Sequence, residues 1–163
     1  MIILSIDPGT TQSGFVTFDG RRVHRAGVVF NDAMLAMVRE PGIADVLAIE
    51  KIEAMGMAVG AEVFETVHWS GRFLQAWHDP AKVRRITRRA VKLGLCGSMR
   101  AKDPNIRAAL IDMLGPQGTK AKPGPCYGVS SHAWAALAVA VIAAGGDALP
   151  SPFERVEAEA GAF

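Results

Sequence analysis

The sequence predicts an α/β protein with a five-stranded mixed sheet, whose first three strands are antiparallel and whose flanks carry helices. Three apolar segments follow one another with short connections, and Asp19-Gly20 between the second and third is a hairpin turn signal. Two further apolar segments alternate with helical patterns, as strands of an α/β sheet do. The predicted strands are residues 2–6, 14–18, 23–30, 45–50 and 82–86.

Five helices are predicted from periodicity and from capping residues. A short helix to residue 38 has Asn31 or Asp32 as its N-cap, and the helix at 103–114 has Asp103 as N-cap. Thr87 caps the helix at 87–93, and a nearly all-apolar helix runs from residue 130 or 131 to 144. The long amphipathic helix at 61–78 is expected to bury Val63, Phe64, Val67, Phe73, Leu74 and Trp77.

The 163 residues are enough for one domain, which we place at residues 1–145. Residues 146–163 are small and acidic, and we expect a loosely held tail. Two cysteines do not make a disulfide framework. The longest apolar stretch, 133–144, has 12 residues, whereas a membrane helix needs ~20. These features predict a soluble, cytoplasmic protein with no membrane partner.

The charge is distributed unevenly along the chain. The formal net charge is +2, but residues 82–122 carry 11 Lys and Arg against two Asp, while the rest of the chain is net acidic. A segment of one sign inside a folded domain favours a polyanionic partner, with nucleic acid first. The alternative is a basic surface without a ligand.

Two predicted strands end on a carboxylate: Asp7 directly follows the strand at 2–6, and Glu50 is the last residue of the strand at 45–50. If the two strands are sheet neighbours, the side chains lie close together and repel each other, unless a divalent cation neutralises them. Carboxylate oxygens suit Mg²⁺ or Mn²⁺. The turn 8–11, Pro-Gly-Thr-Thr, is expected to lead the chain away so that the Asp7 carboxylate stays exposed.

The last helix adds a histidine to this end of the sheet. Its sequence is almost free of polar side chains and predicts a helix packed flat on the sheet, with His132 in its first turn. A single histidine at a helix start is commonly a capping or surface residue. Beside two carboxylates, we interpret His132 as a metal ligand.

Five segments together resemble the RuvC-type Holliday junction endonucleases, especially the branch found in bacteriophages and prophages. They are IDPGTTQSG at the N-terminus, AIEKIEAMG at 48–56, GRF at 71–73, VKLGLCGSMRAKDPNI at 91–106 and YGVSSHAWAALAVAV at 127–141. The resemblance covers nearly all of residues 1–144. It implies a ribonuclease H-like nuclease domain, a homodimer, and a site with two divalent cations that cuts four-way DNA junctions with paired symmetric nicks.

The resemblance also assigns residues. Asp7 matches the carboxylate that bridges the two cations, Glu50 matches the ligand of one cation and His132 the ligand of the other. The family has an aspartate three residues after this position, where this chain has Ala135, and the departure puts the second cation in question. Acids considered as replacements are Asp103, Asp112 and Glu53.

Lys92 matches a lysine that precedes a glycine turn in the family, and we expect it to stabilise charge at the scissile phosphate. The long helix at 61–78 is our choice for the dimer surface. Basic side chains are expected to bind the DNA backbone and so to read shape. They are Arg85, Arg88, Arg89, Lys92, Arg100, Lys102, Lys120 and Lys122.

Three other functions remain open at this point. Because Ala135 removes an anionic ligand, the chain is either a nuclease or a junction-binding protein with a weakened site. A nuclease with broader preference for flaps and forks has the same sequence features. The DPGTT segment also resembles a phosphate loop of actin-like ATPases and sugar kinases, but these need two such lobes and well over 163 residues.

Overall fold

The computed structural model describes residues 1–145, and the expected acidic tail lies outside this part. One five-stranded sheet has the order β3-β2-β1-β4-β5. Antiparallel pairing joins β1 to β2 and β2 to β3, and parallel pairing joins β1 to β4 and β4 to β5. The predicted mixed sheet is therefore confirmed. The strands are β1 (Ile3–Asp7), β2 (Gln12–Phe18), β3 (Val23–Phe30), β4 (Val46–Lys51) and β5 (Val83–Thr87).

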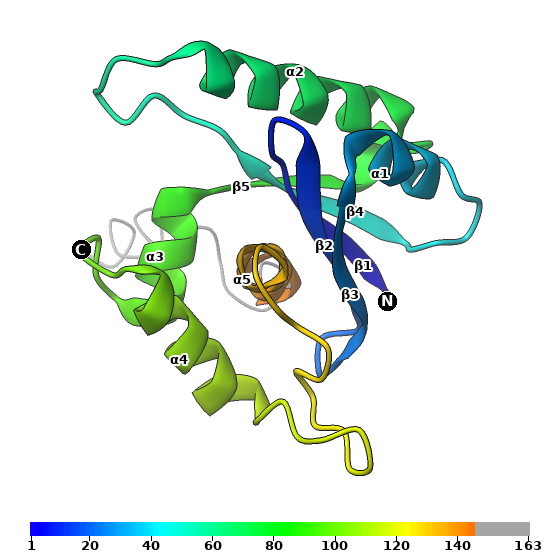
Figure 1. Cartoon of the computed structure of the whole chain (residues 1–163), viewed down its shortest axis with the longest axis vertical. Helices are drawn as coiled ribbons and strands as arrows, with labels where there is room; N and C mark the ends of the chain where they lie inside the picture. Colours follow the sequence, from blue (N-terminus) through cyan, green and yellow to red (C-terminus); the bar gives the residue numbers. More distant parts are fainter. Residues whose placement is uncertain (146–163) are drawn as a thin grey trace, which may run out of the picture.

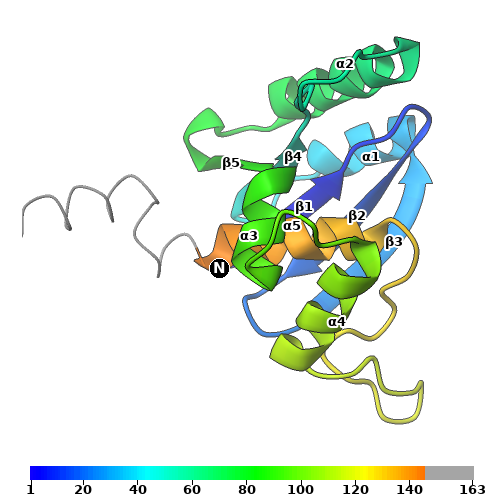
Figure 2. The ribbon, with the colours of Figure 1, turned by 90° about the vertical axis from the view of Figure 1, so that its left-hand side faces the viewer.

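The helices lie in two layers, one on each face of the sheet (Figure 1, Figure 2). On one face α1 packs beside α2, and on the other α5 packs between the sheet and the pair α3 and α4. None of the helices in residues 1–145 is long and apolar enough to cross a membrane. Their bounds are α1 (Asn31–Val38), α2 (Ala61–Ala76), α3 (Arg88–Cys96), α4 (Asp103–Leu114) and α5 (Ala133–Gly145), with a 3₁₀ turn at Pro80–Lys82.

Each face of the sheet has its own hydrophobic core, because alternate strand residues point to opposite sides. Ile3, Val16 and Ala48 pack against α5 together with residues of α3 and α4. Leu4 and Leu47 belong to the second core, which α1 and α2 cover. The apolar sequence of α5 follows from its position, since the sheet lies on one side of it and two helices on the other.

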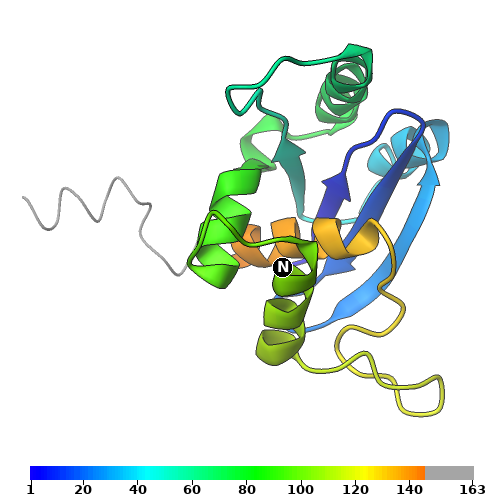
Figure 3. The same ribbon diagram turned by 60° about the vertical axis from the view of Figure 1, so that its left-hand side comes forward.

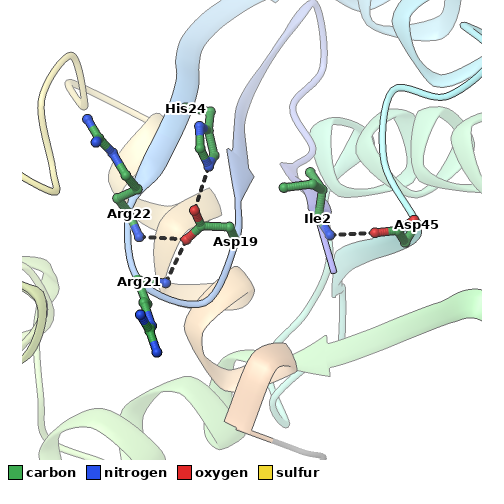
Figure 4. A network of polar contacts seen from close by, with 6 residues as sticks. All are labelled: Ile2, Asp19, Arg21, Arg22, His24 and Asp45. Atoms are coloured by element: carbon green, nitrogen blue, oxygen red, sulfur yellow. Dashed lines mark hydrogen bonds and ion pairs between the residues drawn. The ribbon is translucent and has the colours of Figure 1, made fainter.

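The starts of β1 and β4 are tied together by hydrogen bonds, of which Figure 4 shows the one from the Ile2 amide to the Asp45 side chain. The Ile2 amide donates to Asp45 Oδ2 at 2.6 Å, and the Asp45 amide donates to the Ile2 carbonyl at 2.8 Å. These contacts support the register that pairs Ile6 with Ile49. They therefore fix which residues end the two strands side by side.

A buried polar network holds the turn that follows β1. Ser13 Oγ donates to Asn31 Oδ1 at 2.6 Å, Asn31 Nδ2 donates to the Gly9 carbonyl at 2.9 Å, and the Gly9 amide donates to Ser13 Oγ at 3.2 Å. Ser13 and Asn31 are both almost fully buried. Asn31 was predicted as a helix cap, but its side chain bonds this turn instead, and α1 has no side-chain cap.

Three other sequence expectations are wrong. Lys102, not Asp103, is the N-cap of α4, and the Asp103 carboxylate is engaged by Arg88 instead. On α2, Phe73 and Trp77 are buried as predicted, but Phe64 and Val67 are 64% and 47% exposed because neither α1 nor the sheet covers this side of the helix. The Asp7 side chain, expected to be exposed, is only 16% exposed.

Candidate active site at the ends of β1 and β4

The sheet places Asp7 and Glu50 next to each other. β1 and β4 are parallel neighbours whose last printed pair is Ile6 with Ile49, so the following residues end the two strands at the same edge. On its other side Asp7 pairs with Gly14 of β2. The two carboxyl groups share a side-chain hydrogen bond. The carboxylate pair predicted from the strand ends is therefore assembled.

Both carboxyl groups resist ionisation. Burial is the main cause that raises the pKa of Asp7, and the positive charges of His132 and Arg88 oppose it. Burial and the Asp7 charge together raise the pKa of Glu50 to about 7, from an ordinary value of 4.5. The hydrogen bond between the two groups lowers the pKa of Asp7 and raises that of Glu50. Without a cation the pair therefore holds a proton more readily than two isolated carboxyl groups do.

His132 reaches the carboxylates from the segment immediately before α5. Its Nδ1 lies 3.3 Å from Asp7 Oδ2, and its side chain is 71% exposed. It was predicted in the first turn of the helix, whereas α5 begins one residue later. Ser131 has φ +48°, a backbone conformation that non-glycine residues rarely adopt, and this residue sets the direction in which the chain enters His132.

Gly14 makes the position of His132 possible, and sequence reasoning did not identify it. A Cβ on Gly14 would lie 2.5 Å from the His132 carbonyl oxygen and 2.9 Å from its Cβ. The chain before α5 therefore crosses β2 in direct contact with the strand, beside the residue that pairs with Asp7. A glycine in the middle of a strand was the available sequence signal.

We expect Gly14→Ala to push His132 away from Asp7, because the atoms that the new Cβ would meet are the carbonyl group and the Cβ of His132, and none of them belongs to the flexible end of a side chain. Displacement by about 1 Å is expected to lower catalysis about 10²-fold, and overpacking to cost about 1–3 kcal/mol of stability. Cleavage rates and urea unfolding measure the two effects.

Gly27→Ala on β3 is the matched control for this variant, because its Cβ would meet only the edge of the Phe15 ring, at 3.2 Å. Equal activity losses in both glycine variants would contradict the role of Gly14.

Arg88 brings a fixed positive charge to the site. Arg88 is the first residue of α3 and directly follows Thr87, whose Oγ1 caps the helix. Thr87 pairs with Lys51, the residue after Glu50, so Arg88 begins next to the end of β4. Its charge lowers the pKa of both carboxyl groups, and its guanidinium is hydrogen-bonded to the Asp103 carboxylate. Predicted only as a DNA-binding residue, Arg88 thus belongs to the carboxylate cluster.

Lys92 lies one turn further along α3. Its Nζ donates to the Met99 carbonyl at 3.4 Å, and this contact ties α3 to the connection that leads into α4. It does not figure among the charges that shift the carboxyl pKa values. Its expected role at the scissile phosphate stays a prediction.

A cavity of about 200 Å³ opens beside His132, and Ala135 lines it where the resemblance calls for an aspartate. Among the replacements considered, Asp103 also lines this cavity, and its charge raises the pKa of Glu50. Glu53 pairs with Lys51 at 2.8 Å, and Asp112 is exposed on α4. Only Asp103 is therefore in electrostatic contact with the carboxylate pair.

The donor set suits a hard divalent cation, but it is not arranged as a closed cage. Within residues 1–145 no group of three or more His, Cys, Asp or Glu side chains is placed so as to hold a metal ion. His132 Nδ1 lies against Asp7 Oδ2, at 3.3 Å. Two buried carboxyl groups whose pKa values are both raised nevertheless match a cation by charge, and the exposed imidazole of His132 can turn toward it.

Most of the other residues predicted to bind DNA present their side chains to solvent. Lys120 and Lys122 lie in the loop between α4 and α5, and the rest lie on β5, on α3 and on the connection to α4. The exposed residues are Arg85, Arg89, Arg100, Lys102, Lys120 and Lys122.

Three antiparallel strands followed by two parallel ones, with α5 packed across the sheet and acids at the ends of β1 and β4, define a ribonuclease H-like fold. Comparison of the sequence with protein-family models gives no match, and comparison with curated proteins gives none either.

Among solved structures, the chain is similar to RuvC from Thermus thermophilus. A structure of RuvC in complex with a Holliday junction substrate aligns with a TM-score of 0.66 and 23% identity, covering 87% of this chain and 92% of that one. A second RuvC structure aligns with a TM-score of 0.68 and 22% identity, covering 91% and 96%. The likeness confirms the predicted fold. The resemblance to the phage and prophage branch stays a prediction.

Proposed function

We propose that this chain is a structure-selective endonuclease that resolves four-way DNA junctions by divalent-metal-dependent hydrolysis, giving paired symmetric nicks. The carboxylate pair of Asp7 and Glu50 is the observation that carries the proposal, because burial and mutual repulsion make it a site for a cation. Support also comes from the shared fold with RuvC, one of whose structures contains a Holliday junction substrate. Residues 1–145 are the proposed nuclease domain, acting on DNA in the cytoplasm.

Asp7 and Glu50 would hold the cation, with His132 as a further ligand once its imidazole turns away from Asp7. We expect Mg²⁺, with Mn²⁺ as a substitute, and two ions per site. Bound cations supply an activated water and neutralise charge on the scissile phosphate. Glu50 must lose its proton first, and its pKa of about 7 makes this possible near neutral pH.

Arg88 binds the DNA backbone in this proposal. Its partner Asp103 is 82% exposed, so a phosphate oxygen can replace the Asp103 carboxylate on the guanidinium. The exchange would bring a fixed positive charge next to the carboxylate pair only when DNA is present. Lys92 lies one turn further along α3 and is proposed to stabilise the phosphate from there.

The proposal is tested with a labelled mobile four-way junction and the full-length protein, in Mg²⁺, in Mn²⁺ and with chelator, comparing wild type with Asp7→Asn. Paired nicks that need a cation and disappear in the variant are the expected result. If flaps or forks are cleaved as fast as four-way junctions, the junction-selective function is wrong and the chain is a broader branched-DNA nuclease. Cleavage that persists in Asp7→Asn would refute the assigned site.

A second function, a junction-binding protein that does not cut, is favoured by one observation. The cavity next to His132 carries Ala135 in place of a third carboxylate. Tight binding of the junction with no cleavage in either cation would establish this function, and both functions use the same basic side chains.

We propose that the chain acts as a homodimer through the uncovered side of α2. Phe64 and Val67 are exposed there, and an open groove of about 550 Å³ runs between α1 and α2. Gly71 lies on the same side with open space above it, which permits close approach of a second helix. Exposed apolar surface of this kind marks an interaction site.

Phe64→Asp with Val67→Asp is expected to give a monomer that makes single, unpaired nicks, since a charge at the centre of an apolar interface remains unpaired. Neither side chain is in the core, so folding is retained. Sedimentation equilibrium measures the oligomeric state.

Phe30→Asp, which changes a phenyl group that is 62% exposed at the end of β3, is the matched control for this double variant. A wild-type protein that is monomeric at about 10 μM would contradict the dimer.

A further inference from the structure

The turn between β2 and β3 presents Arg21 and Arg22, neither of which has an acidic partner within residues 1–145. Asp19 Oδ1 accepts the Arg21 and Arg22 amides at 2.8 and 2.9 Å, and Oδ2 contacts His24 Nε2 at 2.6 Å. Burial acts to raise the pKa of Asp19, but these contacts outweigh it and lower the pKa to about 2. The carboxylate is thus used by the turn itself, and both guanidinium groups point away from it (Figure 4).

The loop after α4 lies directly beside this turn. The Val23 amide donates to the Pro125 carbonyl at 2.9 Å, and the two segments meet at the same end of the molecule in two views (Figure 1, Figure 3). Arg21, Arg22, Lys120 and Lys122 are all exposed. Among the described residues, 1–145, the structure gives none of these four side-chain cations an ion pair. We call these four residues the far basic surface.

The loop is a built hairpin and not a random connection. Thr119 and Lys122 exchange backbone hydrogen bonds at 3.0 and 3.1 Å, and Gly118 bridges to Pro123. A Cβ on Gly124 would lie 2.0 Å from the Pro116 carbonyl oxygen, so the crossing requires glycine. Gln117 Nε2 donates to the Val129 carbonyl at 2.6 Å and anchors the base. The two lysines are therefore held at the tip before any ligand binds.

The far basic surface lies at the opposite end of the sheet from the carboxylate pair. Asp7 pairs with Gly14, whereas the turn follows Phe18, which pairs with Ile3. Four strand residues at ~3.3 Å each put the turn at least ~13 Å from Asp7. A DNA strand advances about 3.4 Å per base pair, so a phosphate here is at least about four base pairs from the scissile one.

A cation on α4 connects the two ends. The Arg107 guanidinium stacks over the Trp134 ring at 4.8 Å, and its Nη2 lies 3.4 Å from Gln117 Oε1 at the base of the hairpin. Arg107 also lines the cavity beside His132 that Arg88 lines. Positive charge therefore extends from Arg88, next to the carboxylate pair, through Arg107 on α4 to the far basic surface.

We propose that the far basic surface is a second DNA contact, which binds the phosphate backbone of a duplex arm at least about four base pairs from the cut. This proposal rests on the proposed function. The surface presents four cations on two ordered turns, and within residues 1–145 none of them is in an ion pair. A duplex backbone is the polyanion that can reach both this surface and the carboxylate pair at once. This contact increases the affinity for DNA and orients the duplex arm, whereas hydrolysis takes place at the carboxylate pair at the other end of the sheet.

The test uses the Asp7→Asn background, so that DNA stays intact, and a four-way junction with arms of about 20 base pairs, long enough to cover the far basic surface. The variant Arg21→Ala, Arg22→Ala, Lys120→Ala, Lys122→Ala removes the surface without touching a buried side chain. Lys82→Glu, in the 3₁₀ turn before β5 and outside both the far basic surface and the groove between α1 and α2, is the charge control. Binding is measured against salt concentration, and protected phosphates are mapped by hydroxyl-radical footprinting.

The quadruple variant is expected to bind about 10- to 100-fold more weakly at about 0.1 M salt, and the slope of log K against log salt is expected to flatten by about 3 to 4. Protection beyond about four base pairs from the cut site is expected to disappear while protection at the branch point remains. Lys82→Glu is expected to leave the footprint intact.

A quadruple variant with the slope and footprint of its parent would overturn the second contact while leaving the proposed nuclease untouched. Absence of any DNA binding by the parent would overturn both. Cleavage by wild type is scored separately, so failure of the chemistry does not decide the far basic surface.

Discussion

Glu50→Gln is expected to lower junction cleavage by about 10²- to 10³-fold and, at the same time, to stabilise the metal-free protein above neutral pH. Glutamine keeps the size of the side chain and a hydrogen-bond donor toward Asp7, but it has no charge for a cation. The two effects have opposite signs because both depend on the negative charge of Glu50. This charge is expected to bind the cation, but burial and the Asp7 charge make it unfavourable in the metal-free protein. Few substitutions at a surface position would produce both effects.

The pH dependence gives the sign of the stability effect. Glu50 has a pKa of about 7 in the folded protein and an ordinary value of 4.5, so between these values the folded protein keeps a proton that the unfolded chain has lost. Stability is therefore highest below this window and falls as pH rises through it, by roughly 2–3 kcal/mol without metal. Glu50→Gln removes this contribution.

Urea unfolding at pH 5 and pH 8 in chelator measures the effect, and junction cleavage measures the loss of function. Glu53→Gln, three residues along and paired with Lys51 on the surface, is the matched control and is expected to change neither property substantially. A Glu50→Gln protein less stable than wild type at pH 8 would contradict the repulsion between the two carboxyl groups.

The second large effect is expected from Ala135→Asp. The new carboxylate lies three residues after His132, in the cavity that both positions line, and so adds an anionic ligand to a cluster with two carboxyl groups. We expect divalent-cation affinity to rise by about 10- to 100-fold. The metal-free protein is expected to lose stability at pH 8, because a third negative charge joins a pair that already resists ionisation.

Calorimetric titration with Mn²⁺ and thermal unfolding with and without the cation check this expectation. Ala108→Asp, on the exposed surface of α4, adds the same charge away from the cavity and serves as the control. Equal titration curves for Ala135→Asp and wild type would show that position 135 does not reach the cation. Cleavage that appears only in Ala135→Asp would favour the junction-binding function for the natural sequence.

The sequence was sufficient to predict the sheet and the carboxylate pair because both depend on local signals. Apolar runs that stop at an acid identify the ends of β1 and β4, and parallel neighbours bring their ends to one edge. The turn at Asp19-Gly20 and the Thr87 cap are likewise encoded by adjacent residues. All of these features follow from short segments and the regular geometry of a sheet.

The remaining features depend on contacts between distant segments. The need for glycine at position 14 appears only when the chain before α5 crosses β2. The choice of Arg88 over Lys92 as the charge near the carboxylates depends on where β5 ends relative to Glu50. Phe64 fits the apolar stripe of α2 but remains exposed, because periodicity gives the apolar side of a helix and not the partner that covers it.

The chain order of the site has a consequence during synthesis on the ribosome. Asp7 and Glu50 meet only through a parallel pairing across some forty residues, and His132 joins them from a segment near the end of the described chain. Such long-range pairings form late and slowly. A nascent chain therefore has no assembled site of Asp7, Glu50 and His132 until α5 has emerged and docked, so the activity proposed for this site would begin only after that segment is translated.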